Sequence, residues 1–152
     1  AKGIRAALGA EIHAWSSLAA IAVGSGGSGL VCAAIDARRG QVYAAGYEIV
    51  RDGFEIAGLE PLFGPVAEPF AATLGRLRPA GSWTLAAELP KPLERSAETS
   101  GVRLLPPADR ESAAAALLRL TVSFPTRGRV SDPTTWEPDY VRASSAEREA
   151  MP

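Results

Sequence analysis

The stretch that decides the fold is Leu30-Val-Cys-Ala-Ala-Ile-Asp-Ala-Arg-Arg-Gly-Gln-Val-Tyr-Ala-Ala-Gly-Tyr-Glu-Ile-Val-Arg-Asp-Gly-Phe-Glu-Ile-Ala57. Its first part, Leu30–Asp36, is a nearly continuous apolar run, which predicts a buried strand. Residues 37–40 predict a turn, and Gln41–Val50 predicts a second strand. The Asp-Gly pair that follows is the strongest short hairpin signal, and it leads into a third strand over Phe54–Ala57. The stretch therefore predicts a three-stranded antiparallel meander.

Helices and strands are expected to alternate beyond the meander. Pro69 can begin a helix that carries apolar residues at i, i+4 and i+7. The remaining expected elements are a strand over 82–88, a helix over 92–100, a strand over 102–105 and a helix over 107–120. This order resembles an α/β lobe of the ribonuclease-H-like type, the unit that is duplicated in actin-like (ASKHA) proteins.

The composition argues against several classes of function. The 152 residues have a formal net charge of −1, with 16 basic and 17 acidic residues. Nucleic-acid-binding proteins usually show a basic surplus or stripe, so direct, stand-alone nucleic-acid binding is not expected. The longest apolar runs, Leu18–Val23 and Leu30–Ile35, are far shorter than the ~20 residues that span a bilayer. No signal-peptide pattern is visible and the single cysteine, Cys32, lies in an apolar run, so a cytoplasmic protein with a buried thiol is expected.

Asp36 is the first candidate for chemistry because it ends the first strand, where ribonuclease-H-like nucleases place a metal-binding carboxylate. A two-metal hydrolase needs several carboxylates converging on ions about 4 Å apart. The other candidates are Glu88 at a strand end and Asp109 or Glu111 at a helix start. Alternatively, Asp36 accepts a hydrogen bond from the backbone of its own turn.

The turn after Asp36 bears on nucleotide binding. In actin-like ATPases the corresponding hairpin is a Gly-rich loop whose backbone wraps phosphate groups. Here Arg38 and Arg39 occupy positions where small residues would be needed, because bulky side chains keep backbone amides away from phosphate. The two cations could attract an anion or an acidic partner surface, or they could simply be solvated.

No catalytic or metal-binding constellation stands out. His13 is the only histidine, so a zinc or iron site would have one imidazole and otherwise carboxylates, which is not expected. A triad of Ser16 or Ser17 with His13 and Asp36 can be drawn, but no nucleophile-elbow motif supports it. We therefore expect no catalytic residue, no metal and no cofactor.

Four segments resemble the TsaB (YeaZ) family in the order that the family shows. They are Ala1-Lys-Gly-Ile-Arg-Ala-Ala-Leu-Gly9, Ser16-Ser-Leu18, Ala34-Ile-Asp-Ala-Arg-Arg-Gly-Gln-Val-Tyr43 and Pro138-Asp-Tyr-Val-Arg142. The third segment is the most specific and the fourth supports it. Residues 53–124 are matched by the order of their elements rather than by a motif.

The resemblance implies a non-catalytic scaffold subunit in the modification of tRNA with threonylcarbamoyladenosine. Its implied partners are a TsaD-like catalytic subunit and a TsaE-like ATPase, with a homodimer as a further option. Some similar sequences carry a glycoprotease label, so a peptidase-labelled actin-fold protein remains an alternative, as does a metal-dependent hydrolase of the ribonuclease-H type. The residues that the resemblance singles out are Arg38, Arg39, Ile4 and Leu8 for partner or anion contact, Asp36, Gly40 and Tyr43 in the turn motif, and Pro138, Tyr140 and Arg142 in the tail motif.

The resemblance also implies how the chain is divided. Residues 1–24 are expected to be a remnant helix, ending at Gly9, and a connector from a missing first lobe. Residues 25–124 are expected to form the ribonuclease-H-like lobe. Residues 125–152 are expected to be an extended tail that returns toward the first lobe.

Overall fold

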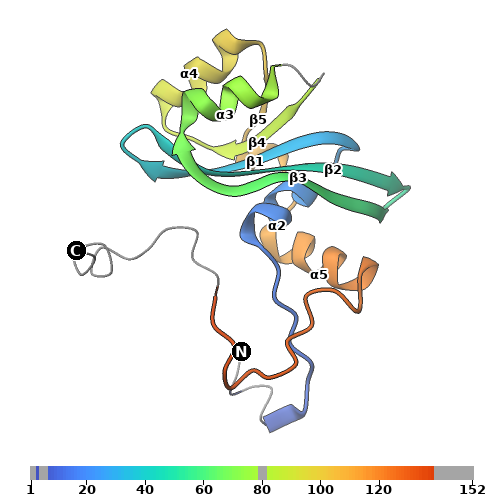
Figure 1. The fold of residues 1–152 in the computed structure, drawn as a ribbon. Helices are drawn as coiled ribbons and strands as arrows, with labels where there is room; N and C mark the ends of the chain where they lie inside the picture. The colour runs from blue at the N-terminus through green and yellow to red at the C-terminus, as the bar shows by residue number, and fades with distance from the viewer. Residues whose placement is uncertain (1–2, 4–6, 79–81, 139–152) are drawn as a thin grey trace, which may run out of the picture.

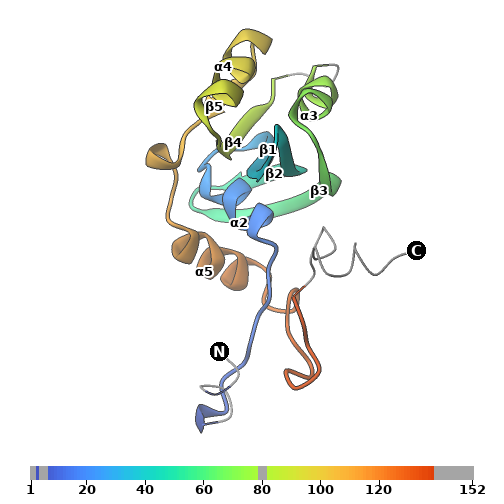
Figure 2. The same cartoon turned by 90° about the vertical axis from the view of Figure 1, so that its left-hand side faces the viewer.

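The computed structural model describes residues 3, 7–78 and 82–138. They form a mixed five-stranded sheet with the strand order β3-β2-β1-β4-β5, covered by helices on both faces (Figure 1). Helices α2 (Ser17–Gly24) and α5 (Ala113–Ser123) lie on one face, and α3 (Phe70–Leu77) and α4 (Lys91–Ser100) lie on the other (Figure 2). None of the helices in this part of the chain has the length and apolarity that crossing a bilayer requires.

The central strands follow the apolar stretch of the sequence. β1 (Gly29–Arg38) pairs antiparallel with β2 (Gln41–Asp52), and β2 pairs antiparallel with β3 (Glu55–Pro69). On its other side β1 pairs parallel with β4 (Thr84–Glu88), which pairs parallel with β5 (Arg103–Leu105). Because β1 is covered on both faces, its residues 31–34 are all buried, as the continuous apolar run predicts.

β3 is much longer than the expected strand over 54–57. It extends to Pro69 and contains Pro61 and a cis Gly64–Pro65 peptide bond. Proline removes a backbone donor, which normally argues against a strand. It is tolerated here because β3 is an edge strand, and the chain accommodates the prolines at shifts in its register with β2.

The edge of β3 is partly covered by side chains from the C-terminal segment. The backbone N–H of Ile56 donates to Ser123 Oγ at 3.3 Å, and Arg127 donates to the carbonyl oxygen of Leu59 at 3.4 Å. Such contacts occupy groups that would otherwise be open to another strand.

The helix that was expected over 107–120 begins later. Residues 107–109 form a single 3-10 turn, Arg110 is extended, and α5 starts only after Ser112, whose side chain accepts from the N–H of Ala115. The N–H of Glu111 instead donates to the carbonyl oxygen of Gly24 at 2.8 Å. This long-range contact at the end of α2 holds the segment out of the helix.

α2 begins after Ser16, whose Oγ accepts a hydrogen bond from the N–H of Leu18 at 3.2 Å. It is apolar around its whole circumference and buries Leu18, Ala19, Ala20, Ala22 and Val23. A helix of this kind has to be enclosed, and α2 lies between the sheet and α5.

Residues 10–16 and 126–130 run side by side away from the sheet (Figure 1). The two segments form one antiparallel bridge, between His13 and Arg129. Its backbone bonds join Ala14 N–H to Gly128 O at 2.7 Å and Val130 N–H to Ile12 O at 2.9 Å. Before this segment, Leu8 is helical and Gly9 has φ +64°, as expected at a helix end.

Candidate functional site

The turn between β1 and β2 is stabilised by a hydrogen bond between neighbouring residues and has an unusual backbone conformation. Asp36 Oδ1 accepts a hydrogen bond from the N–H of Arg38 at 2.9 Å. Arg38 and Arg39 have φ values of +69° and +55°, and Gly40 has +73°. Positive φ is uncommon in residues with a side chain and often marks a functional or strongly constrained turn. Of the two alternatives for Asp36, the structure therefore supports the turn-capping one.

The turn lies beside the start of α3. The carbonyl oxygen of Gly40 accepts from the N–H of Phe70 at 3.0 Å, and Pro69 supplies no side-chain cap to the helix. Arg38 and Arg39 are exposed and make no ion pair with a described residue. Tyr43 is half-buried within β2, opposite Ile35 of β1 and Ala67 of β3. The turn thus places two cations that pair with none of the described residues next to a helix start that has no side-chain cap.

Asp36 and Glu88 do not form the metal site that the alternative hydrolase hypothesis requires. Glu88 is in register with Ile35 across the parallel pair of β1 and β4, so their side chains share the α2 and α5 face. Asp36 follows Ile35 and points to the opposite face by the alternation of a strand. Within residues 3, 7–78 and 82–138, no three His, Cys, Asp or Glu side chains are arranged to hold a metal ion. The hypothesis of divalent ions between these two carboxylates is wrong, because the sheet separates them.

The other two candidate carboxylates, Glu111 and Asp109, also take no part in a metal site among the described residues. Glu111 forms a two-pronged ion pair with Arg119, at 3.1 Å to Nε and 2.7 Å to Nη2, and this lowers the pKa of Glu111. Asp109 lies in the 3-10 turn Pro107–Asp109, which follows β5 and has no buried residue, whereas Asp36 belongs to β1.

The residues of the possible triad have other partners. Ser16 caps α2, and His13 Nδ1 lies 3.3 Å from the carbonyl oxygen of Arg127 while its Nε2 lies 3.7 Å from Glu11. Asp36 is engaged with its own turn. Among the described residues, no hydrogen bond joins His13 to Ser16, Ser17 or Asp36, so the triad is not formed.

The remaining expected contact residues are only partly covered by the structure. Leu8 is 75% exposed and Pro138 is exposed. Ile4, Tyr140 and Arg142 lie outside the described residues. Of the tryptophans, Trp83 is buried in the core beneath α3 and α4, and Trp136 is 38% exposed.

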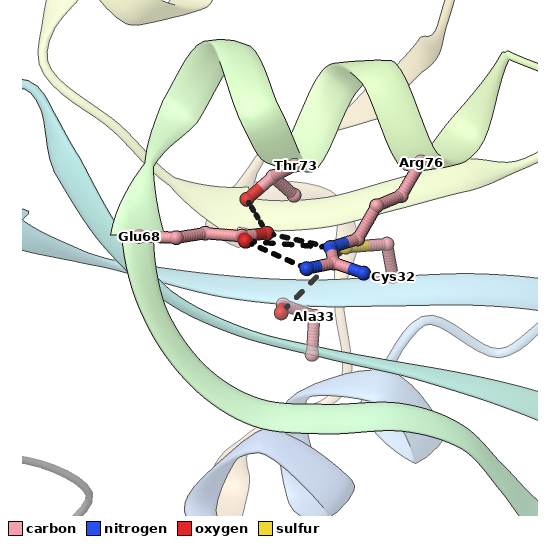
Figure 3. Close-up of polar contacts among 5 residues, drawn as sticks. All are labelled: Cys32, Ala33, Glu68, Thr73 and Arg76. Carbon is pink, nitrogen blue, oxygen red and sulfur yellow. Dashed lines mark hydrogen bonds and ion pairs between the residues drawn. The ribbon is translucent and has the colours of Figure 1, made fainter.

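A polar cluster beneath α3 was not found by sequence reasoning (Figure 3). Glu68, near the end of β3, accepts from Thr73 Oγ1 at 3.0 Å and is bound through both oxygens by Arg76 of α3. The Arg76 guanidinium also lies over the Phe63 ring, 5.7 Å from its centroid. The pKa of the Glu68 carboxyl is lowered, first by the hydrogen bond from Arg76 and further by that from Thr73. No spacing motif marks such a cluster, because its members come together only when α3 folds back on β3.

Cys32 lies beside this cluster (Figure 3) and is completely buried. Burial raises the pKa of its thiol to about 12, and the charge of Glu68 adds to the effect. A thiol that stays protonated and inaccessible is unreactive, so Cys32 is a core residue, as the apolar run predicts.

Replacing Glu68 with glutamine is expected to destabilise the protein at neutral pH, because glutamine cannot form the two-pronged ion pair. The pKa of Glu68 is depressed in the folded state, so its contribution is present above the ordinary pKa near 4.5. That contribution is lost as the pH falls through the lower folded-state pKa. Urea unfolding of the wild-type protein and of Glu68→Gln, at pH 7 and at the lowest pH where both proteins fold, measures the difference between their free energies of unfolding. We expect this difference to be smaller at the lower pH. A constant difference would assign the effect to packing rather than to charge.

Comparisons with known proteins show a shared fold. No protein-family model matches the chain, and no curated protein sequence matches it. The structure is similar to that of an uncharacterized protein with similarity to peptidase YeaZ from Pseudomonas aeruginosa, with a TM-score of 0.61 and 21% identity over 93% of this chain. The chain spans 63% of the length of that protein. YeaZ from Pseudomonas aeruginosa is 20% identical over 76% of this chain and 62% of its own, with a TM-score of 0.42, too low to support an argument. The mixed α/β fold is therefore that of a YeaZ-like structure.

Proposed function

We propose that this chain is a TsaB-type scaffold subunit of the machinery that modifies tRNA with threonylcarbamoyladenosine. The observation that carries the proposal is the combination of a YeaZ-like fold over 93% of the chain with the turn motif from Asp36 to Tyr43. The proposed partners are a TsaD-like catalytic subunit and a TsaE-like ATPase in the cytoplasm. Neither the fold nor the motif alone would support this function, since one fold can host many functions.

The finer description of the fold belongs to the same proposal. We assign the sheet to the ribonuclease-H-like lobe of actin-like proteins. Three antiparallel strands followed by two parallel ones, with helices on both faces, support this assignment.

We further propose that residues 1–24 and 125–152 lead from the lobe of residues 25–124 to a first lobe, with α2, at the end of the first segment, packed on the sheet of the lobe. Two observations support this. The YeaZ-like structure is longer than this chain, and α5 leaves Leu117, Leu118 and Val122 exposed by 38%, 69% and 76%. An intact-mass measurement on the protein from its source is expected to exceed 15.8 kDa, and a mass equal to that value would contradict the proposal.

The partner role is tested by size-exclusion chromatography of the full-length protein with the TsaD-like subunit of the same organism. We expect one complex to elute ahead of both components. Leu8→Asp is expected to weaken the complex because it places a charge on an exposed apolar residue of the N-terminal segment. Leu62→Asp, at an exposed leucine on β3, is the matched control and is expected to have less effect. Separate elution of the wild-type proteins at concentrations of tens of micromolar would contradict the partner role.

We also propose that the chain contributes no catalytic group. The Asp36 side chain accepts a hydrogen bond from the N–H of Arg38 in its own turn, and an asparagine oxygen can accept the same bond. Asp36→Asn is therefore expected to leave the rate of tRNA modification by the assembled complex unchanged. Loss of modification with an intact complex would contradict this assignment.

A further inference from the structure

One face of the sheet is only half covered. Val42 and Ala44 of β2 are buried in the core beneath α3 and α4. By alternation, Glu48, Val50 and Asp52 lie further along the same face, and all three are exposed. Figure 1 shows that this end of β2 and β3 extends beyond α3 and α4. The end of the β2–β3 hairpin is therefore a stretch of sheet without a helix over it.

The charged side chains on this stretch are acidic. Glu48 lies directly opposite Glu60 of β3, and Asp52 lies opposite Glu55, so the carboxylates form two facing pairs. None of the four forms an ion pair or a side-chain hydrogen bond with another described residue. Like charges directly opposite one another destabilise a strand pair, so each pair gains from a cation placed over it. Within the described part of the chain, no three His, Cys, Asp or Glu side chains are arranged to hold a metal ion, so the two pairs do not form a metal site.

An apolar strip separates the two acidic pairs. Val50 is 52% exposed, and its partner on β3 is Gly58, which adds no side chain. A Cβ on Gly58 would lie 3.4 Å from the Cβ of Val50, so the two residues lie side by side. Glu48 and Asp52 are four residues apart on β2, which separates the pairs by about 13 Å at roughly 3.3 Å per residue. We call this surface, Glu48, Val50, Asp52, Glu55, Gly58 and Glu60, the acidic face.

The dimensions of the acidic face fit an α-helix. A helix rises about 1.5 Å per residue, so two pairs of basic residues that are seven positions apart are separated by about 10.5 Å. The flexible stems of lysine and arginine span the remaining difference. A residue midway between the basic pairs lies on the same side of the helix and meets Val50. An extended segment lying across the face would leave its backbone N–H and C=O groups without partners, whereas a helix satisfies its own.

We propose that the acidic face docks a basic amphipathic helix of a different protein, with two cations over each acidic pair and an apolar side chain against Val50. The bound helix then extends the layer that α3 and α4 form on this face. The N-terminal segment with Leu8 lies on the other side of the sheet, beyond α2 and α5 (Figure 1). The inference therefore does not rest on the proposed partner role, which is tested through Leu8.

A synthetic peptide is the probe in the first test. It is an alanine-based helix of about twenty residues in which a pair of adjacent lysines recurs after seven positions, with one leucine midway. Fluorescence anisotropy is expected to show binding to the full chain below about 100 μM peptide at about 20 mM salt. Binding is expected to be at least about tenfold weaker at about 200 mM salt, because salt screens exposed charges. No binding at about 1 mM peptide and low salt would overturn the proposal.

A second peptide separates helix docking from general attraction of cations. It has the same composition, but its four lysines are spread evenly around the helix. We expect it to bind at least about fivefold more weakly, because it cannot place both pairs of charges on the acidic face at once. Equal binding of the two peptides would mean that the acidic face attracts cations without docking a helix, and would overturn the proposal.

Charge reversal then locates the surface. Glu48→Lys with Glu60→Lys is expected to weaken binding of the first peptide by at least about tenfold. Glu98→Lys with Asp109→Lys is the matched control, because it makes the same change in net charge at exposed acids outside the acidic face. The control is expected to bind within about twofold of the wild type. Unchanged binding by the first variant, or an equal loss in both, would overturn the proposal.

A neutral variant covers the case in which the charge reversal prevents folding, as judged by circular dichroism. Asp52→Asn with Glu55→Gln keeps the size of both side chains at the other acidic pair and removes only their charge. It is expected to weaken binding of the first peptide by at least about threefold. Wild-type affinity in this variant would overturn the proposal.

Discussion

Gly64→Ala is expected to destabilise the protein by roughly 2–4 kcal/mol, the sum of two effects. Gly64 has φ +83°, a conformation that costs alanine about 1–2 kcal/mol. A Cβ at this position would also lie 2.6 Å from the carbonyl oxygen of Ala44 and 2.9 Å from Ala45 Cα. These are backbone atoms of β2, in the middle of the sheet, and they cannot rotate away as the tip of a side chain can.

A second glycine separates the two effects. Gly53 also has positive φ, +58°, but a Cβ there would meet no atom within 4 Å. Gly53→Ala is therefore expected to cost only about 1–2 kcal/mol. Urea unfolding of both variants measures the difference. Equal destabilisation by the two substitutions would show that β3 relaxes away from β2 and that the close approach is not a constraint.

Leu120→Ala is expected to destabilise the protein by about 2–5 kcal/mol, the range for removing a large side chain from a well-packed core. Leu120 is completely buried where α5 packs against α2 and the sheet. The neighbouring Ala116 is too small to fill the space that the substitution leaves.

Leu118→Ala is the matched control on the same helix. Leu118 is 69% exposed, so its truncation is expected to change the free energy of unfolding by no more than about 0.5 kcal/mol. Thermal or urea unfolding of the two variants gives the comparison. A large effect at Leu118 together with a small one at Leu120 would mean that α5 is rotated relative to the arrangement described above.

The core strands could be predicted because their signal is local. The apolar run Leu30–Ile35 has six residues and no polar side to turn to solvent, so β1 has to lie in the middle of a sheet. The Asp-Gly pair after β2 likewise sets the position of the hairpin, since Gly53 takes the positive φ that the turn requires. Ser16 at the start of α2 and Asp36 in its turn also act on the nearest backbone groups, which the sequence places next to them.

Other features depended on contacts between distant segments. The length of β3 could not be read from a segment containing Pro61 and Pro65, because only its position at the edge of the sheet makes prolines acceptable. The late start of α5 depends on a bond between Glu111 and Gly24, which are far apart in the chain. The cluster of Glu68, Thr73 and Arg76 similarly requires α3 to turn back over the end of β3.

By itself, the sequence determined the apolar strands, the tight turns and the absence of a histidine pair, because each is a property of neighbouring residues or of composition. Only the tertiary structure decided which side chains meet. Strand register put Asp36 and Glu88 on opposite faces of the sheet, and it put Glu48 against Glu60 and Asp52 against Glu55 on one face. Register is set by packing and hydrogen bonding across the whole sheet, and a shift of one residue would turn each side chain to the other face.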